Sequence, residues 1–395
     1  MLSKMNNKEY YSSLTGLWYT VWWQDNSENT PAAYRPRSAH WEDWTRVIPV
    51  RGEYSSGDPA IIREHLQLFA DNGIDFILLD DTNSHAGDFG SIAYNIDQIF
   101  KTASEMDNAP QIAVALGGTL NSPEQAGTIE QRNLEADIIY EKYVKGYPKQ
   151  YFLWKGKPLL VSYGLPQYFR WDDDRFTVRY ATGNVNEGIV SGYVPKTGLW
   201  GWVFNSQTDN DEVYGVIPGF NKGPIQGDSP EKMMDQIKRE QGNYYMKNWL
   251  AAIKADREVI MITSWNDFAE EPAIEAALPR NDADIDISVK RIGYPMDLRH
   301  ERDKGNGRDR HNIWLDYYGD PAPFWYEELT WSYLALKNGL RENCFYKEEN
   351  KDNVYLYSSR RLHEQFQMPH GHPIITIPDG YFGWFFDLVR QPQVR

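Results

Sequence analysis

Short apolar runs that alternate with helix-like segments are the feature that most constrains the fold of this chain. In one clear example, segment 58–72 opens with Asp-Pro, carries an apolar face at helical spacing and ends at Asn-Gly. The apolar run 74–79 follows directly and predicts a strand. Strands are predicted at 14–23, 74–79, 112–116, 159–163, 176–180, 199–204, 212–217 and 259–264. Helices are predicted at 58–72, 91–106, 124–144, 230–255 and 324–340. This alternation indicates an α/β protein with a parallel sheet.

The number of predicted strands and the length of 395 residues favour one (β/α)8 barrel, or TIM barrel, over residues 14–341. A doubly wound sheet would need a glycine-rich phosphate loop after an early strand, and the sequence has none. Segment 281–319 is charged and irregular, and we interpret it as an insertion after the last strand. Residues 342–395 alternate β-like runs with turns, which predicts a small C-terminal β-rich extension packed on the barrel.

Composition narrows the class of partner. The formal net charge of −15 argues against binding to a nucleic-acid backbone or an anionic membrane surface. Aromatic residues make up 14% of the chain, and their flat faces can stack on sugar rings or fill a large core. No stretch is long enough to predict a membrane span. Residues 1–13 are polar and lack the apolar part of a secretory signal, which favours a cytoplasmic location. The oligomeric state is not predicted.

Two carboxylates follow the last predicted strand, and the active sites of such barrels lie at the carboxyl ends of the strands. Asp267 and Glu270 are three residues apart, a spacing that can direct both carboxyls into one cleft. Glycosidases use such a pair, with one group giving a proton to the leaving oxygen and the other acting as base or nucleophile. The competing interpretation is that Asp267 caps the following turn and Glu270 is solvated.

Asp80 and Asp81 follow the second predicted strand. Either could bind sugar hydroxyls or supply the second carboxylate, or one could cap the loop through Asn83. Further candidates for contact with a sugar are aromatic or polar residues near other strand ends, namely Trp22, Trp23, Tyr163, Trp202, Asn205, Trp265, Asn266 and Glu271. Core packing is an equal alternative for each tryptophan. The sequence lacks a zinc-type cluster, and its acidic stretch 282–286 lacks the other parts of a calcium loop, so no metal or cofactor is expected.

Residues 263–275 (TSWNDFAEEPAIE) resemble a known motif. It is the strand-eight motif of glycoside hydrolase family 99, the endo-α-mannosidase and endomannanase group, and of its family 71-like relatives. That motif reads roughly T-S-F-N-E-W-x-E-G-x-x-I-E. Weaker similarities occur in the same order at 54–80, 157–161, 216–220 and 242–249, so the resemblance covers about residues 16–276.

The resemblance implies a retaining, endo-acting glycosidase on a barrel. In the family the first motif carboxylate acts as a base on the sugar 2-hydroxyl, and the second is the general acid/base. These positions are Asp267 and Glu270 in this chain. Asp267 is one methylene shorter than the family glutamate, and Glu271 stands where the family has glycine, so the sugar and the linkage stay open. The alternatives are a non-catalytic glycan-binding barrel and a sugar transferase on the same fold.

Overall fold

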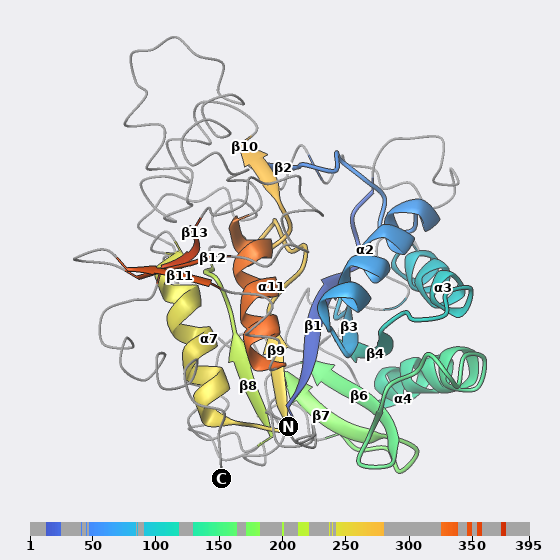
Figure 1. The fold of residues 1–395 in the computed structure, drawn as a ribbon. Helices are drawn as coiled ribbons and strands as arrows, with labels where there is room; N and C mark the ends of the chain where they lie inside the picture. Colours follow the sequence, from blue (N-terminus) through green and yellow to red (C-terminus); the bar gives the residue numbers. More distant parts are fainter. Residues whose placement is uncertain are drawn as a thin grey trace, which may run out of the picture.

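In the computed structural model the described residues are 13–24, 41, 45, 47–83, 85, 91–117, 129–163, 171–181, 200, 212–220, 237, 239, 242–279, 325–338, 346–349, 354–357 and 373–376. A curled sheet of parallel strands forms the centre of this part of the molecule (Figure 1). Its parallel strands are β1 (Leu14–Thr20), β3 (Phe76–Asp81), β4 (Gln111–Leu116), β6 (Lys157–Tyr163), β7 (Thr177–Ala181), β8 (Val213–Val216) and β9 (Val259–Ile262). A short strand, β5 (Leu153–Trp154), pairs antiparallel with β6.

The parallel strands are hydrogen-bonded in the order β8-β9-β1-β3-β4-β6-β7. The pairing of β9 with β1, which aligns Leu14 with Val259, is the contact that the predicted barrel requires between its last and first strands. Within the described residues the sheet is open between β7 and β8. The predicted strand 199–204 falls in this interval, and Trp200 is its one described residue. The Trp200 amide donates to the Tyr180 carbonyl at 2.6 Å. The α/β class with a parallel sheet is therefore confirmed, and full closure of the barrel stays a prediction.

Alternate residues of the strands belong to two different clusters of buried side chains. One cluster fills the inside of the curl and includes Trp18 of β1 together with Phe76 and Leu78 of β3. The other lies between the sheet and the helices and includes Ile77 and Leu79. The apolar strands are buried on both faces, as in parallel sheets covered by helices, so they appear in the sequence as continuous apolar runs.

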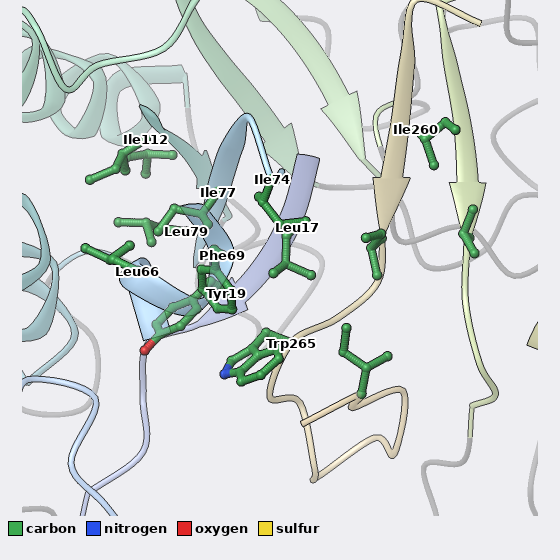
Figure 2. Close-up of a cluster of buried hydrophobic side chains, with 14 of the residues drawn as sticks. Leu17, Tyr19, Leu66, Phe69, Ile74, Ile77, Leu79, Ile112, Ile260 and Trp265 are labelled. Atoms are coloured by element: carbon green, nitrogen blue, oxygen red, sulfur yellow. The ribbon is translucent and has the colours of Figure 1, made fainter. Parts of the chain in front are cut away.

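Helix α2 (Pro59–Asn72) shows how the outer layer is fixed by local sequence. The Asp58 side chain accepts a hydrogen bond from the Ala60 amide at 2.8 Å, and Gly73 ends the helix in the left-handed conformation (φ 82). Figure 2 shows Leu66 and Phe69 of this helix against the outer-facing side chains of β1 and β3. Burial of each such side chain contributes roughly 1.5–3 kcal/mol to stability.

The other described helices are α3 (Ser91–Ser104), α4 (Ile129–Ile138), α7 (Asn243–Ala255) and α11 (Trp325–Lys337). α4 continues as a π-helical segment, η3 (Ile139–Val144). The helix predicted at 230–255 starts too early, because Ile237 forms an antiparallel bridge with Phe220. Gly242 then adopts a left-handed conformation (φ 94) directly before α7. The first and last strands are also shorter than predicted and end at Thr20 and Ile262.

Two antiparallel sheets accompany the parallel one. β2 (Val47–Pro49) pairs with β10 (Ala277–Pro279), which joins the segment between β1 and α2 to the segment after β9. β11 (Tyr346–Glu349), β12 (Val354–Tyr357) and β13 (Pro373–Thr376) form a three-stranded sheet in the segment predicted to be β-rich. The domain boundary at 341/342 stays a prediction. Among the described helices, none has both the length and the apolar character to cross a membrane.

Two charged side chains, Lys337 and Asp75, are held by hydrogen bonds at the amino-terminal edge of the parallel sheet. Lys337, at the end of α11, donates to the Ser13 carbonyl and to Thr15 Oγ1, both at 2.6 Å. The Thr15 amide donates to Asp75 Oδ2 at 2.6 Å. Burial, the largest effect, lowers the pKa of Lys337 to about 8, although the nearby charge of Asp75 raises it. These contacts tie α11 to the start of β1 and to the residue before β3.

A partly buried ion pair spans the opening between β7 and β8. Arg179 of β7 donates to both carboxylate oxygens of Glu212 at 2.6 and 2.7 Å, and Glu212 directly precedes β8. The indole nitrogen of Trp200 donates to the same carboxylate at 3.0 Å. This two-point contact links the two strands that lack a backbone ladder between them in the described part of the chain.

Candidate active site

The segment after β9 folds back on itself at the carboxyl edge of the sheet. The Trp265 amide donates to the Trp18 carbonyl at 2.8 Å, which extends the pairing of β9 with β1. The Ile274 and Glu275 amides both donate to the Trp265 carbonyl, at 3.1 and 2.9 Å. Residues 265–275, the site loop, therefore leave and return at the same point of the sheet.

Asn266 fixes the start of the site loop through its side chain. The Thr20 amide donates to Asn266 Oδ1 at 2.8 Å, and Asn266 Nδ2 donates to the Thr20 carbonyl at 3.1 Å. The side-chain amide thus takes the place of a peptide group and continues the ladder beside β1. Asn266 is fully buried, and the next residue, Asp267, is held at the end of the strand by this contact.

Asp267 both caps a turn and belongs to a buried carboxylate cluster. Its Oδ1 accepts from the Ala269 and Glu270 amides at 3.1 and 3.0 Å, so the capping interpretation describes a real contact. Its Oδ2 has no hydrogen-bond partner within the described residues. Burial, and then the charge of Glu270, raise the pKa of Asp267 well above its usual value. Glu270 itself is partly exposed, so it can meet both solvent and a ligand.

Asp80 supplies a third carboxyl to the same region. It lies at the strand position two residues beyond Leu78, and the period of two along β3 directs it to the inside of the curl. Burial raises the pKa of Asp80 to about 6, and the charges of Glu270 and Asp81 add to this effect. The Thr82 amide donates to Asp80 Oδ1 at 3.1 Å.

Gly117, after β4, allows the chain beyond Asp80 to pass close by. A Cβ at Gly117 would lie 1.8 Å from the Thr82 carbonyl oxygen, a distance that no side chain tolerates. The turn that carries Asp80 therefore packs directly on the backbone of the neighbouring strand end. This close approach keeps Asp80 in a defined position.

Asp81 points to the other side of the sheet. It has the same parity as Ile77, and its Oδ2 lies 2.8 Å from His85 Nδ1. The Tyr143 hydroxyl lies 3.5 Å from His85 Nε2 and donates to Asp97 at 2.8 Å. Asp80 and Asp81 were predicted together, and the structure brings only Asp80 to the cluster of Asp267 and Glu270. Asn83 is exposed and follows this turn.

The aromatic residues predicted to contact a sugar fall into two groups, those buried in the core and those that are partly exposed. Trp23 is buried and stacks on Trp41 with ring centroids 4.2 Å apart. Trp265 is buried on the helix side, where its ring lies 4.8 Å from that of Phe69 (Figure 2). Trp22 and Tyr163 are only partly buried. Trp202 and Asn205 lie outside the described residues.

Glu271 occupies a backbone position that suits glycine. It is buried and adopts φ 61, in the left-handed region. Holding a residue with a Cβ in this region costs on the order of 1 kcal/mol. Arg239 stabilises the conformation by donating to the Glu271 and Ala273 carbonyls at 2.7 and 2.6 Å. The guanidinium of Arg239 also lies over the Tyr326 ring, 4.2 Å from its centroid.

Sequence reasoning missed the polar residues beneath the site loop. The Tyr54 hydroxyl donates to Glu275 Oε2 at 2.7 Å, and Asn266 Nδ2 donates to the same hydroxyl at 3.0 Å. His65 Nε2 lies 3.4 Å from Glu275 Oε1. One signal was present in the sequence: His65 is a polar residue at an apolar position of a helix. Across the described ranges, no group of three or more His, Cys, Asp or Glu side chains is arranged to hold a metal ion.

No known family model matches the sequence, and no curated protein matches it. Among solved structures, two of the GH99 endo-α-mannosidase from Bacteroides thetaiotaomicron are similar to this chain, one of them in complex with Bis-Tris-propane. Their TM-scores are 0.50 and 0.51, at 18% sequence identity, with 68% of this chain and 89% of that chain covered. At this identity the likeness is a distant relation in fold: the chain has a glycoside-hydrolase-like α/β architecture.

Proposed function

We propose that this protein is a glycoside hydrolase that cleaves an oligo- or polysaccharide, acting within the chain and on an α-linkage. The observation that carries the proposal is the buried Asp267 beside Glu270, directly after β9, at the carboxyl edge of a parallel sheet. Glycosidic bonds are broken by such pairs of carboxyls in distinct environments. The likeness in fold to an endo-α-mannosidase supports the same class of chemistry.

Glu270 is proposed as the general acid and base, because partial exposure lets it contact a substrate and exchange protons with water. Asp267 is proposed as the base on the sugar 2-hydroxyl, the role that the resemblance gives to this position. Its Oδ1 is engaged by the turn, which leaves Oδ2 for this task.

The proposed reaction has two balanced steps. In the first, Asp267 takes the proton of the 2-hydroxyl, that oxygen bonds to the anomeric carbon, and Glu270 protonates the departing oxygen. In the second, water attacks the anomeric carbon, Glu270 takes a proton from it, and Asp267 returns a proton to the sugar oxygen. The net change is hydrolysis with retention of configuration.

Substrate contacts are proposed for Asp80 and for the two partly exposed aromatic residues, Trp22 and Tyr163. A carboxylate at the end of β3 can accept hydrogen bonds from sugar hydroxyls, and the aromatic faces can stack on a ring. We also propose that the barrel closes fully over 14–341, with the strand at 199–204 between β7 and β8, and that 342–395 forms its extension.

The test is release of reducing ends from a panel of α-mannans, α-glucans and bacterial polysaccharides. Glu270→Gln and Asp267→Asn should each lose roughly 10²-fold or more in kcat. Glu105→Gln removes a carboxylate from an exposed ion pair with Arg63 and serves as the matched control. Its activity should equal that of the wild type.

Other outcomes point to the alternatives. Binding to a glycan without cleavage of any panel member would identify a glycan-binding barrel. Products that carry no label when the reaction runs in ¹⁸O water would identify sugar transfer. Full activity in Asp267→Asn would remove Asp267 from the mechanism and leave Asp80 as the second carboxylate to test.

A further inference from the structure

A buried polar network lies directly beneath the site loop. It consists of Tyr19, Tyr54, His65, Asn266 and Glu275, the Glu275 network. Each member is at most 3% exposed. The members come from β1, the segment before α2, α2 itself and the site loop, so the network joins the loop to parts of the chain far away in sequence.

Glu275 sets the direction of the hydrogen bonds. As a carboxylate it can only accept, so the Tyr54 hydroxyl must donate its one hydrogen to Glu275 Oε2. The Tyr54 oxygen is then left as an acceptor. The group of Asn266 that faces it at 3.0 Å must therefore be the amide nitrogen, Nδ2.

This choice fixes the orientation of the whole Asn266 amide. Nδ2 has a second hydrogen, which goes to the Thr20 carbonyl, and Oδ1 then faces the Thr20 amide. In the opposite orientation the side-chain nitrogen would face the Thr20 amide, donor against donor. Leaving such buried groups unsatisfied costs roughly 1–3 kcal/mol each. The charge of Glu275 thus favours the one orientation in which Asn266 pairs with β1.

Glu275 is itself held from the opposite side. His65 Nε2 lies 3.4 Å from Oε1, and the Tyr19 hydroxyl lies 2.9 Å from His65 Nδ1. Arg51 Nη1 is 3.9 Å from the same Oε1 and 2.8 Å from Glu327 Oε1. The carboxylate is therefore buried between His65 of α2 and the cation of Arg51, which Glu327 of α11 holds in turn.

We infer that Glu275 is a positioning residue, which acts through Tyr54 and Asn266 to hold Asp267 in its place at the end of β9. This inference rests on the proposed function, since it assigns a role in the same reaction. Asp267 follows Asn266 directly, so a change in the pairing of Asn266 with β1 moves the Asp267 carboxyl. A displacement of about 1 Å in a catalytic group can reduce the rate roughly 10²-fold.

The experiment compares Glu275→Gln, Tyr54→Phe and the wild type on the best substrate of the glycan panel. Both variants should lose about 10-fold to 10²-fold in kcat with KM nearly unchanged, because substrate contacts stay in place. Glu212→Gln is the matched control, since it removes a buried carboxylate at the opposite edge of the sheet. It should keep the wild-type kcat whatever its effect on thermal stability.

A double-mutant cycle separates positioning from general damage. On a substrate with a good leaving group, which keeps residual activity measurable, Glu275→Gln should have little further effect in an Asp267→Asn background. Losses that multiply in the double variant, or a wild-type kcat in both Glu275→Gln and Tyr54→Phe, would overturn the inference. Should Glu275→Gln fail to fold, Tyr54→Phe decides, because it cuts the link to Asn266 and keeps the charge.

The wild type distinguishes this failure from failure of the proposed function. Cleavage by the wild type that Glu270→Gln abolishes, with both network variants unaffected, overturns the positioning role alone. Absence of cleavage by the wild type overturns the proposed function and this inference together.

Discussion

The charged side chains at the two edges of the parallel sheet have different neighbours. At the amino-terminal edge, the charge that acts on Lys337 is that of Asp75, and the charge that acts on Asp75 is that of Lys337, so the two groups are of opposite sign. At the carboxyl edge, the charges that act most strongly on Asp267 are those of Glu270 and then Asp80, which are carboxylates like itself. Carboxylates buried together raise one another's pKa and reduce stability. Such an arrangement is typical of sites shaped by chemistry rather than by folding.

The difference teaches where the molecule gains stability and where it gives stability up for function. The pair of Arg179 with Glu212 occupies a position where the sheet needs closing, and both partners are satisfied. Burial would raise the pKa of Glu212, but the hydrogen bonds from Arg179 bring it below its usual value. Asp80 and Asp267 show the reverse shift. Mutation and changes of pH can therefore test the charged groups of each edge separately.

The largest expected effect on stability is at the opening between β7 and β8. Arg179→Met leaves Glu212 buried without its cation, which should lower the free energy of unfolding by about 3 kcal/mol. Chemical denaturation followed by circular dichroism measures this change. Arg63→Met is the matched control, because Arg63 pairs with Glu105 in solvent, where such a pair contributes less than about 1 kcal/mol. Equal effects of the two variants would contradict a closing role for the Arg179 pair.

Lys337 should make the amino-terminal edge more stable as pH rises. The pKa of Lys337 is about 8 in the folded protein, against an ordinary value of 10.5. As pH rises, the folded protein therefore releases this proton before the unfolded chain does. The stability gained from deprotonation of Lys337 is fully present above pH 10.5, the ordinary pKa that applies to the unfolded chain, and is lost as pH falls toward the folded pKa of about 8. From pH 8 to 10, stability relative to Lys337→Met should rise by about 2 kcal/mol. A difference between the two proteins that stays constant over this range would show that Lys337 is not shifted.

Asp80 should show the opposite sign at the carboxyl edge. Its pKa is about 6 when folded and 3.8 ordinarily, so the folded state holds its proton longer. The stability gained from the protonated Asp80 is fully present below pH 3.8 and is lost as pH rises through about 6. Relative to Asp80→Asn, the wild type should lose up to about 2 kcal/mol from pH 4 to 7. The measurement is denaturant unfolding at several pH values, and the variant should be more stable at pH 7 yet less active. If the stability of the wild type instead rose relative to that of the variant from pH 4 to 7, the result would contradict the proposed site.

Much of the fold follows from the sequence because strands buried on both faces appear as continuous apolar runs, and α2 carries its own start and stop residues. The prediction of a helix at 230–255 was wrong at its start, because Gly242 is in the left-handed conformation and α7 begins after it. At the site, Asp267 and Glu270 could be found from their place after a strand. The separation of Asp80 from Asp81 follows from the period of two along β3, counted from Leu78.

The Glu275 network could not be found in this way. Tyr54 and Glu275 are 221 positions apart, and the residues around each describe only local structure. Their contact depends on how the segment between β1 and α2, which carries Tyr54, packs against the site loop after β9. Such pairings are products of tertiary packing. The motif at 263–275 includes Glu275, but neither the motif nor the histidine at an apolar position of α2 identifies the partners of this carboxylate.

The smallest effect concerns the departure from the family motif at Glu271. Glu271→Gly places the residue that best tolerates φ 61 at this position, and the gain should outweigh the extra freedom of glycine in the unfolded chain. The expected net stabilisation is about 0.5 kcal/mol, measured by thermal unfolding. Glu271→Ala is the matched control, because it removes the same carboxylate and keeps a Cβ in the left-handed region. If Glu271→Gly stabilises the protein and Glu271→Ala does not, the gain comes from relief of the left-handed backbone conformation. Equal stabilisation by both variants would instead mean that the Glu271 carboxylate costs stability, which would add Glu271 to the cluster of Asp267, Glu270 and Asp80.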